Sequence, residues 1–137
     1  MTLNLLPDSE RLIRAYLAQV SEITAIVGTA ISTEQPTSLP APCLTFTRLV
    51  SPVAPLLPES MDVCRIQVDA WATDKATANT LARTARAALR ACTNYTLATV
   101  GTLGGASIVS DIAWMPDVSR TPPTPRYTLV IDVYARP

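Results

Sequence analysis

A single stretch, from Arg65 to Cys92, constrains the fold of this chain more than any other. Its first part, RIQVDAW, alternates apolar with polar residues, which is typical of a strand with one buried face. After a short turn, Thr73 is expected to cap a helix, with Asp74 in the first turn. The apolar residues of this helix recur at helical spacing: Ala78, Leu81, Ala82, Ala85, Leu89 and Cys92. The stretch therefore predicts a strand, a tight turn and a long amphipathic helix.

The remaining sequence supplies a first helix and three further strands. Asp8 precedes an amphipathic run that reaches Val20, and Ser21 is expected to cap a short helical turn that Gly28 ends. Alternating or apolar runs predict strands at residues 43–50, 62–71, 106–114 and 126–136. Segments 96–105 and 116–125 are interpreted as connections. The Pro-rich segment 51–61 is either a long loop or the tip of an extended hairpin.

These elements define the fold class. We predict one α+β domain over residues 1–137, with elements in the order α-β-β-α-β-β. A single four-stranded mixed or antiparallel sheet is expected, with the two main helices packed on one face. The alternation at residues 62–71 and 126–136 predicts that the other face of the sheet stays partly polar.

Composition excludes several classes of partner. Eleven basic residues balance eleven acidic ones, and a neutral chain is a poor candidate for a general nucleic-acid binder or a membrane-surface binder. We also expect no sequence-specific binding of nucleic acid. No apolar run reaches the roughly 18 residues that a membrane-spanning helix needs. The N-terminal segment MTLNLLPDSERLIR lacks the pattern of a signal peptide, so we expect a cytosolic site of synthesis.

The sequence offers little for catalysis. It contains no histidine, so Ser–His–Asp and Cys–His arrangements are impossible. Its three cysteines are scattered without metal-ligand spacing, and we interpret them as buried free thiols: Cys43, Cys64 and Cys92. Asp69, Asp111 and Asp132 lie on three strands and could hold Mg²⁺ only if they shared a face. We favour solvated or arginine-paired carboxylates, and predict no catalytic, cofactor or metal site.

The best candidate for a partner surface is a row of arginines on the long helix. Arg83, Arg86 and Arg90 are spaced three and four residues apart, so they share one helical face. No acidic residue follows Asp74 in this helix, so these arginines have no acid to pair with along it. Two interpretations remain open: a solvated basic face near the helix C-terminus, or a surface that pairs with acids of a neighbouring subunit.

Two other features are candidates for contact with a neighbour. Leu56 and Leu57 lie in the Pro-rich segment, where they either dock on a neighbouring subunit or fold back over their own sheet edge. Trp71 and Tyr134 are expected on the open face of the sheet, and aromatic residues are enriched in interfaces.

Three segments together carry a resemblance to a known family. The first is ITAIVGTAIS followed by PAPCLTFTRL, the second is RIQVDAWATDKATANTLARTARAALRA, and the third is RYTLVIDVYAR. In order and spacing they resemble the tail terminator or tail-completion proteins of siphophages, which include the lambda-type minor tail protein that ends tail growth. The resemblance covers most of the chain.

The resemblance implies a structural role in the virion. Such proteins form a homohexameric ring that caps the tail-tube protein at the tube end near the neck, and they present a surface to the head-side connector. Assembly would take place in the host cytoplasm, and DNA would pass through the ring lumen. The family brings no catalytic residues. A head-closure or adaptor protein of the neck is the first alternative, followed by a small carboxylate or metal-dependent enzyme and by a monomeric binding domain.

Overall fold

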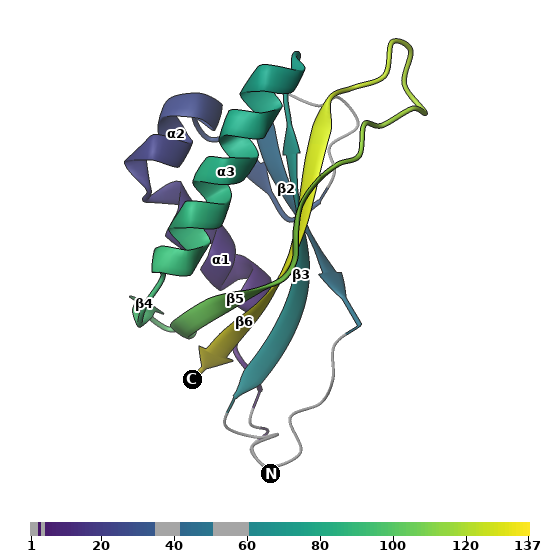
Figure 1. Cartoon of the computed structure of the whole chain (residues 1–137). Helices are drawn as coiled ribbons and strands as arrows, with labels where there is room; N and C mark the ends of the chain where they lie inside the picture. The colour runs from purple at the N-terminus through teal and green to yellow at the C-terminus, as the bar shows by residue number, and fades with distance from the viewer. Residues whose placement is uncertain (1–2, 4, 35–41, 51–60) are drawn as a thin grey trace.

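The structure is a computed structural model that describes residues 3, 5–34, 42–50 and 61–137. Its helices are α1 (Ser9–Ala18), α2 (Ser21–Val27) and α3 (Lys75–Ala91). Its strands are β1 (Ile31–Ser32), β2 (Cys43–Leu49), β3 (Asp62–Trp71), β4 (Tyr95–Leu97), β5 (Gly101–Trp114) and β6 (Arg126–Arg136). The strands form one sheet in the order β1-β2-β3-β6-β5-β4, and Figure 1 shows all three helices on the same side of its curved surface. The predicted α+β class is confirmed.

The prediction of a four-stranded sheet is wrong, because the described residues form a six-stranded one. The two additional strands, β1 and β4, are only two and three residues long, too short to show an alternating pattern. The predicted connection at residues 96–105 is instead a hairpin in which β4 pairs antiparallel with the start of β5. Gly101 has a φ of 151°, and a Cβ there would lie 2.7 Å from the carbonyl oxygen of Arg136. The glycine therefore allows the strand to pass close to β6.

Two predicted helix caps are displaced by one residue. The N-cap of α3 is Asp74 and not Thr73, because the Asp74 carboxylate accepts a hydrogen bond of 2.8 Å from the Thr77 backbone N–H. The hydrogen bonds from Thr77 also hold the pKa of Asp74 below its ordinary value. The N-cap of α2 is Val20, without a side-chain hydrogen bond. Gly28 ends α2 with a φ of 61°, as its position predicts.

The core lies between the sheet and the helices. On β3 the predicted apolar face is fully buried, and the stripe predicted on α3 packs against it. The residues that these two elements bury are Cys64, Ile66, Val68, Ala70, Ala78, Leu81, Ala82, Ala85 and Leu89. The Tyr16 hydroxyl of α1 donates to the carbonyl oxygen of Ala88 at 2.6 Å, which ties the first helix to the third. Small residues on α3 let this helix lie close to the sheet.

The opposite face of the sheet is polar, as its alternation predicts, but not all of it is open. Thr128 on β6 donates a hydrogen bond of 2.7 Å to the Asp69 carboxylate, and both side chains are buried. Closer to the other end, Arg65 and Asp132 pair across β3 and β6 at 2.9 Å while remaining partly exposed. This face therefore satisfies its polar groups within the chain.

Candidate interaction surface

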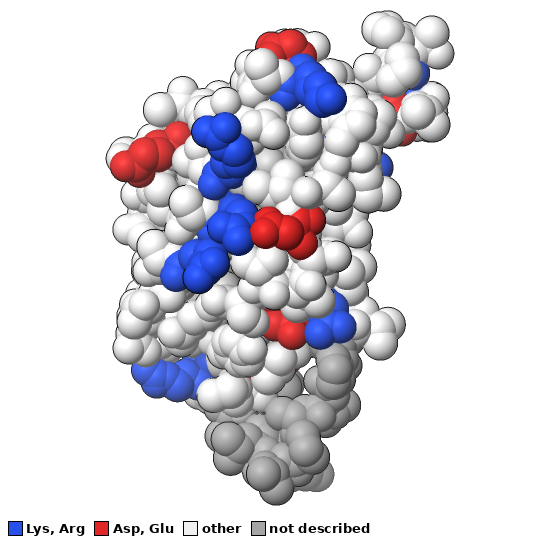
Figure 2. Space-filling view, in the orientation of Figure 1, with Lys and Arg blue, Asp and Glu red and all other residues white. Residues whose placement is uncertain are grey.

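The predicted arginine row occupies the solvent side of α3. Arg83 and Arg90 are exposed, and Arg86 between them is partly buried. Figure 2 shows basic side chains following one another along this helix, with an acidic side chain beside the row. In a helix whose apolar face packs on the sheet, the residues of the opposite face point toward solvent. The same periodicity that builds the core therefore exposes the arginines.

Arg86 pairs with an acid of another element of its own chain, which neither interpretation of the arginine row included. Its guanidinium group donates to both oxygens of Asp111 on β5, at 2.8 and 3.0 Å. The backbone N–H of Ile112 donates to the same carboxylate at 2.8 Å. The Arg86 hydrogen bonds, followed by that of Ile112, hold the pKa of Asp111 below its ordinary value. Arg86 therefore ties α3 to β5, and its ion-pair partner comes from its own chain.

The other two arginines remain available. Among the described residues, Arg83 makes only a long contact of 3.5 Å, to the side-chain oxygen of Asn79 one turn away. Arg90 has no ion pair within the described ranges, although its charge contributes to the lowered pKa of Asp111. The row thus combines one arginine paired within the chain with two that face solvent.

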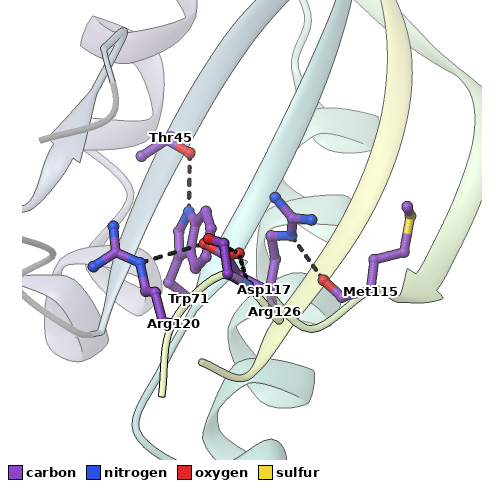
Figure 3. Close-up of polar contacts among 7 residues, drawn as sticks. Thr45, Trp71, Met115, Asp117, Arg120 and Arg126 are labelled. Atoms are coloured by element: carbon purple, nitrogen blue, oxygen red, sulfur yellow. Dashed lines mark hydrogen bonds and ion pairs between the residues drawn. The ribbon is translucent and has the colours of Figure 1, made fainter. Parts of the chain in front are cut away.

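The prediction that Trp71 lies on an exposed face is wrong. Its side chain is 1% exposed, and its indole N–H donates to the Thr45 hydroxyl at 3.0 Å, as Figure 3 shows. The guanidinium group of Arg126 lies 4.8 Å above the Trp71 ring and donates to the carbonyl oxygen of Met115. Trp71 therefore belongs to the interior of the subunit.

Of the three remaining candidates for contact with a neighbour, the structure describes one. Tyr134 is partly exposed, and its hydroxyl lies 3.1 Å from that of Ser107 on β5, so it remains a candidate. Leu56 and Leu57 lie outside the described residues.

The three aspartates considered for a metal site do not come together. Asp111 is paired with α3 on the helical side of the sheet, whereas Asp69 and Asp132 are bound by β6 and β3 residues on the other side. No cluster of potential metal ligands occurs in the part of the chain that the structure describes. The predicted buried thiols are confirmed, and burial raises the pKa of Cys64 to about 11.

Sequence reasoning missed the exposed side of β5. Exposed apolar residues lie in the second half of this strand and in the connection beyond it, namely Val109, Trp114, Met115 and Val118. Figure 1 shows this connection projecting from the body of the molecule. The only sequence signal was the lack of a clear apolar alternation in the segment SIVSDIAWM.

Comparisons with known proteins agree with a structural role. The model of a family described as tail completion protein gp17 matches residues 11–111. A solved chain from the virion of a native gene transfer agent particle superposes with a TM-score of 0.66 at 19% identity, covering 93% of this chain and 94% of that one. At that identity the likeness shows a shared fold. No curated protein sequence matches the chain.

The family match decides the class of protein. It spans well over half of the chain, from α1 through α3 and into β5. None of the helices in the described ranges has the length and apolar character to cross a membrane. The predicted resemblance is confirmed: the chain belongs to the tail completion protein gp17 family and is a structural protein of phage tails.

Proposed function

We propose that this protein ends tail-tube growth by forming a ring on the end of the tube, and that the ring then offers a joining surface to the head-side connector. The family match supports the role in tail completion. A ring needs two different surface patches on each subunit, one meeting the other on the next copy. A hexamer, located in the virion at the tube end near the neck and assembled in the host cytoplasm, is the form that we expect.

The observation that supports the proposed ring is that the two edges of the molecule differ in charge. At the β5 edge, Arg83 and Arg90 lie on α3, which Arg86 fastens to that strand. At the β1 edge, a surface hollow contains the acidic side chains of Asp8, Glu10 and Glu34.

Two arginines also line this hollow. Arg14 is partly engaged, because its guanidinium group donates to the carbonyl oxygen of Ile31 at 2.9 Å, and Arg11 lies at the exposed side of α1. The acids outnumber the bases there, and a basic row meeting an acidic hollow would orient successive copies in the same sense. This asymmetry favours a head-to-tail contact over a two-fold one.

The function is tested by electron microscopy of tails made without this protein. We expect tubes of uncontrolled length that lack heads, and tubes of normal length when the wild-type protein is supplied in trans. Tubes of normal length in its absence would exclude the proposed role in termination. Normal tube length combined with a failure to join heads would instead support an adaptor role in the neck.

The interface is tested by reversing charge at each edge. Native mass spectrometry should show that Arg83→Glu combined with Arg90→Glu reduces the oligomer while circular dichroism shows an intact fold. Adding Glu34→Arg in the hollow should restore part of the oligomer. Glu22→Arg on α2, which makes the same change of charge outside the hollow, should restore none. Equal rescue by both would contradict a specific contact at the hollow.

A further inference from the structure

The sheet has an uncovered stretch on each of its two long outer strands. Among the described residues, β1 pairs with Leu44 and Thr45 of β2, and no strand pairs with the outer side of residues 46–49. Strand β4 pairs only with residues 101–103 of β5. Within the described ranges, no strand pairs with the outer side of β5 from residue 104 to residue 114. Both edges therefore offer backbone N–H and C=O groups to another strand.

The two uncovered stretches lie at the same level of the sheet. Three rows of register partners that start in the uncovered stretch of β2 run across all four long strands to the β5 edge. These rows are Leu49–Arg65–Asp132–Ser107, Arg48–Ile66–Ile131–Ile108 and Thr47–Gln67–Val130–Ser110. The short strands β1 and β4 cover other parts of the two edges. Strand β1 lies opposite Leu44 and Thr45 of β2, and β4 lies opposite residues 101–103 of β5. A second copy set beside the first at equal height would thus bring one open stretch against the other.

The strand directions allow this pairing. Strands β2, β3, β6 and β5 alternate in direction, since each neighbouring pair is antiparallel. Because the number of alternating strands is even, β2 and β5 run in opposite directions. A copy placed head-to-tail therefore presents its β2 antiparallel to the β5 of its neighbour, and the sheet continues without reversing either molecule.

The irregular pairing of β5 restricts the partner that fits. The register with β6 shifts on both sides of Ser110, and Asp111 at the second shift is held by Arg86. Bulges on an edge strand bend it and discourage indiscriminate pairing. The longest stretch of β5 that they leave in regular pairing is residues 105–108, which matches the four uncovered residues of β2 in length.

We propose that the free edge of β5 in one copy pairs with the free edge of β2 in the next, so that the sheet continues across the subunit boundary. This inference rests on the proposed ring, and it adds a backbone contact to the charge contact between α3 and the hollow. The partner is a second copy of this chain. Hydrogen bonds between backbones would fix the height and direction of successive subunits more strictly than side-chain charges can.

Cross-linking tests this pairing on the full-length protein. Thr47→Cys and Ser110→Cys are combined in one chain, because both positions are exposed and lie in the same row. A short bismaleimide should then convert the monomer band into a ladder of covalent oligomers on a denaturing gel. The native thiols are buried and do not compete. The matched control combines Thr47→Cys with Gln19→Cys, an exposed position on the helical side, and should give no ladder.

The outcomes separate the edge pairing from the ring itself. Native mass spectrometry of the unlinked variant records whether the oligomer forms. An oligomer without a ladder, or one whose ladder also appears in the Gln19→Cys control, overturns the edge pairing and leaves the ring in place. Thr47→Cys alone or Ser110→Cys alone should give no covalent dimer. A dimer from either variant would indicate contact between two like edges and would also overturn the edge pairing. A protein that stays monomeric at every concentration overturns both proposals.

Discussion

The two sides of α3 differ in which groups their side chains contact. On the side toward the sheet, Leu81, Ala85 and Leu89 are fully buried in the core of their own subunit. On the solvent side, Arg83 and Arg90 are exposed and have no ion pair among the described residues. Arg83 and Arg90 therefore contribute little to the fold and are free to serve assembly, whereas Arg86 between them links α3 to β5. The predictions below test this division between residues that hold the fold and residues that do not.

The largest effect is expected from Leu81→Ala. This side chain is 0% exposed, and truncating a buried leucine costs about 2–5 kcal/mol, since apolar contacts are lost and a cavity remains. Urea denaturation followed by circular dichroism measures the loss. Leu5→Ala is the matched control, because Leu5 is 82% exposed and its truncation should change stability by less than about 0.5 kcal/mol. Equal midpoints for the two variants would contradict the packing of α3 against the sheet.

A smaller loss is expected from Trp71→Phe. The substitution removes the indole N–H that binds Thr45 and leaves a buried hydroxyl without its partner, which costs about 1–3 kcal/mol. Thermal unfolding measures the change. Trp114→Phe is the matched control, because Trp114 is 39% exposed and its indole nitrogen makes no hydrogen bond within the described structure. A larger effect at Trp114 would show that the burial of Trp71 does not determine its contribution.

The helices and long strands were predictable because their signal is local. The periodicity of α3 and the alternation of β3 depend only on which residues face the core, and the structure confirms both. The segment GTLGG was misjudged because its glycines are typical of a turn, whereas Gly101 is required where β5 approaches β6. Local patterns do not reveal a close approach between distant backbones.

The candidate surface was less predictable because its partners come from other elements. Alternation placed Trp71 on the polar face of β3, but it gives no information on what covers that face, and Arg126 of β6 lies over the ring. Spacing along α3 showed that Arg86 has no acid on its own helix. It could not show that β5 brings Asp111 to the guanidinium group. Long-range pairing depends on register and bulges, which the sequence does not display.

Arg86→Ala should have a small effect that depends on pH. The pKa of Asp111 is lowered in the folded protein, so the pair stabilises the fold above the ordinary aspartate pKa of about 3.9 and this contribution is lost as pH falls through the lowered pKa. The difference in melting temperature between wild type and variant should therefore be largest near neutral pH and shrink on acidification. A difference that grows on acidification would contradict this assignment.

A direct reading of the same ion pair comes from titrating the Asp111 carboxyl by NMR. In Arg86→Ala its pKa should rise toward the ordinary value, but only partly, because the Ile112 backbone N–H still binds the carboxylate. Arg90→Ala is the control, since its charge is the weakest contributor to the lowered pKa. Equal shifts in the two variants would show that general charge, and not the paired hydrogen bonds, sets the pKa of Asp111.

The smallest effect on the fold is expected from Arg83→Ala, and this comparison defines the solvent side of α3 most sharply. Within the described structure the one polar contact of the Arg83 side chain is to Asn79 of its own helix, at 3.5 Å, and exposed contacts of this length contribute little to folding. Alanine also has the highest helix propensity, which offsets the loss of that contact. The urea midpoint of unfolding should therefore stay unchanged while the oligomer seen by native mass spectrometry weakens. If the midpoint falls as far as it does for Trp71→Phe, then Arg83 holds the fold and cannot be assigned to assembly alone.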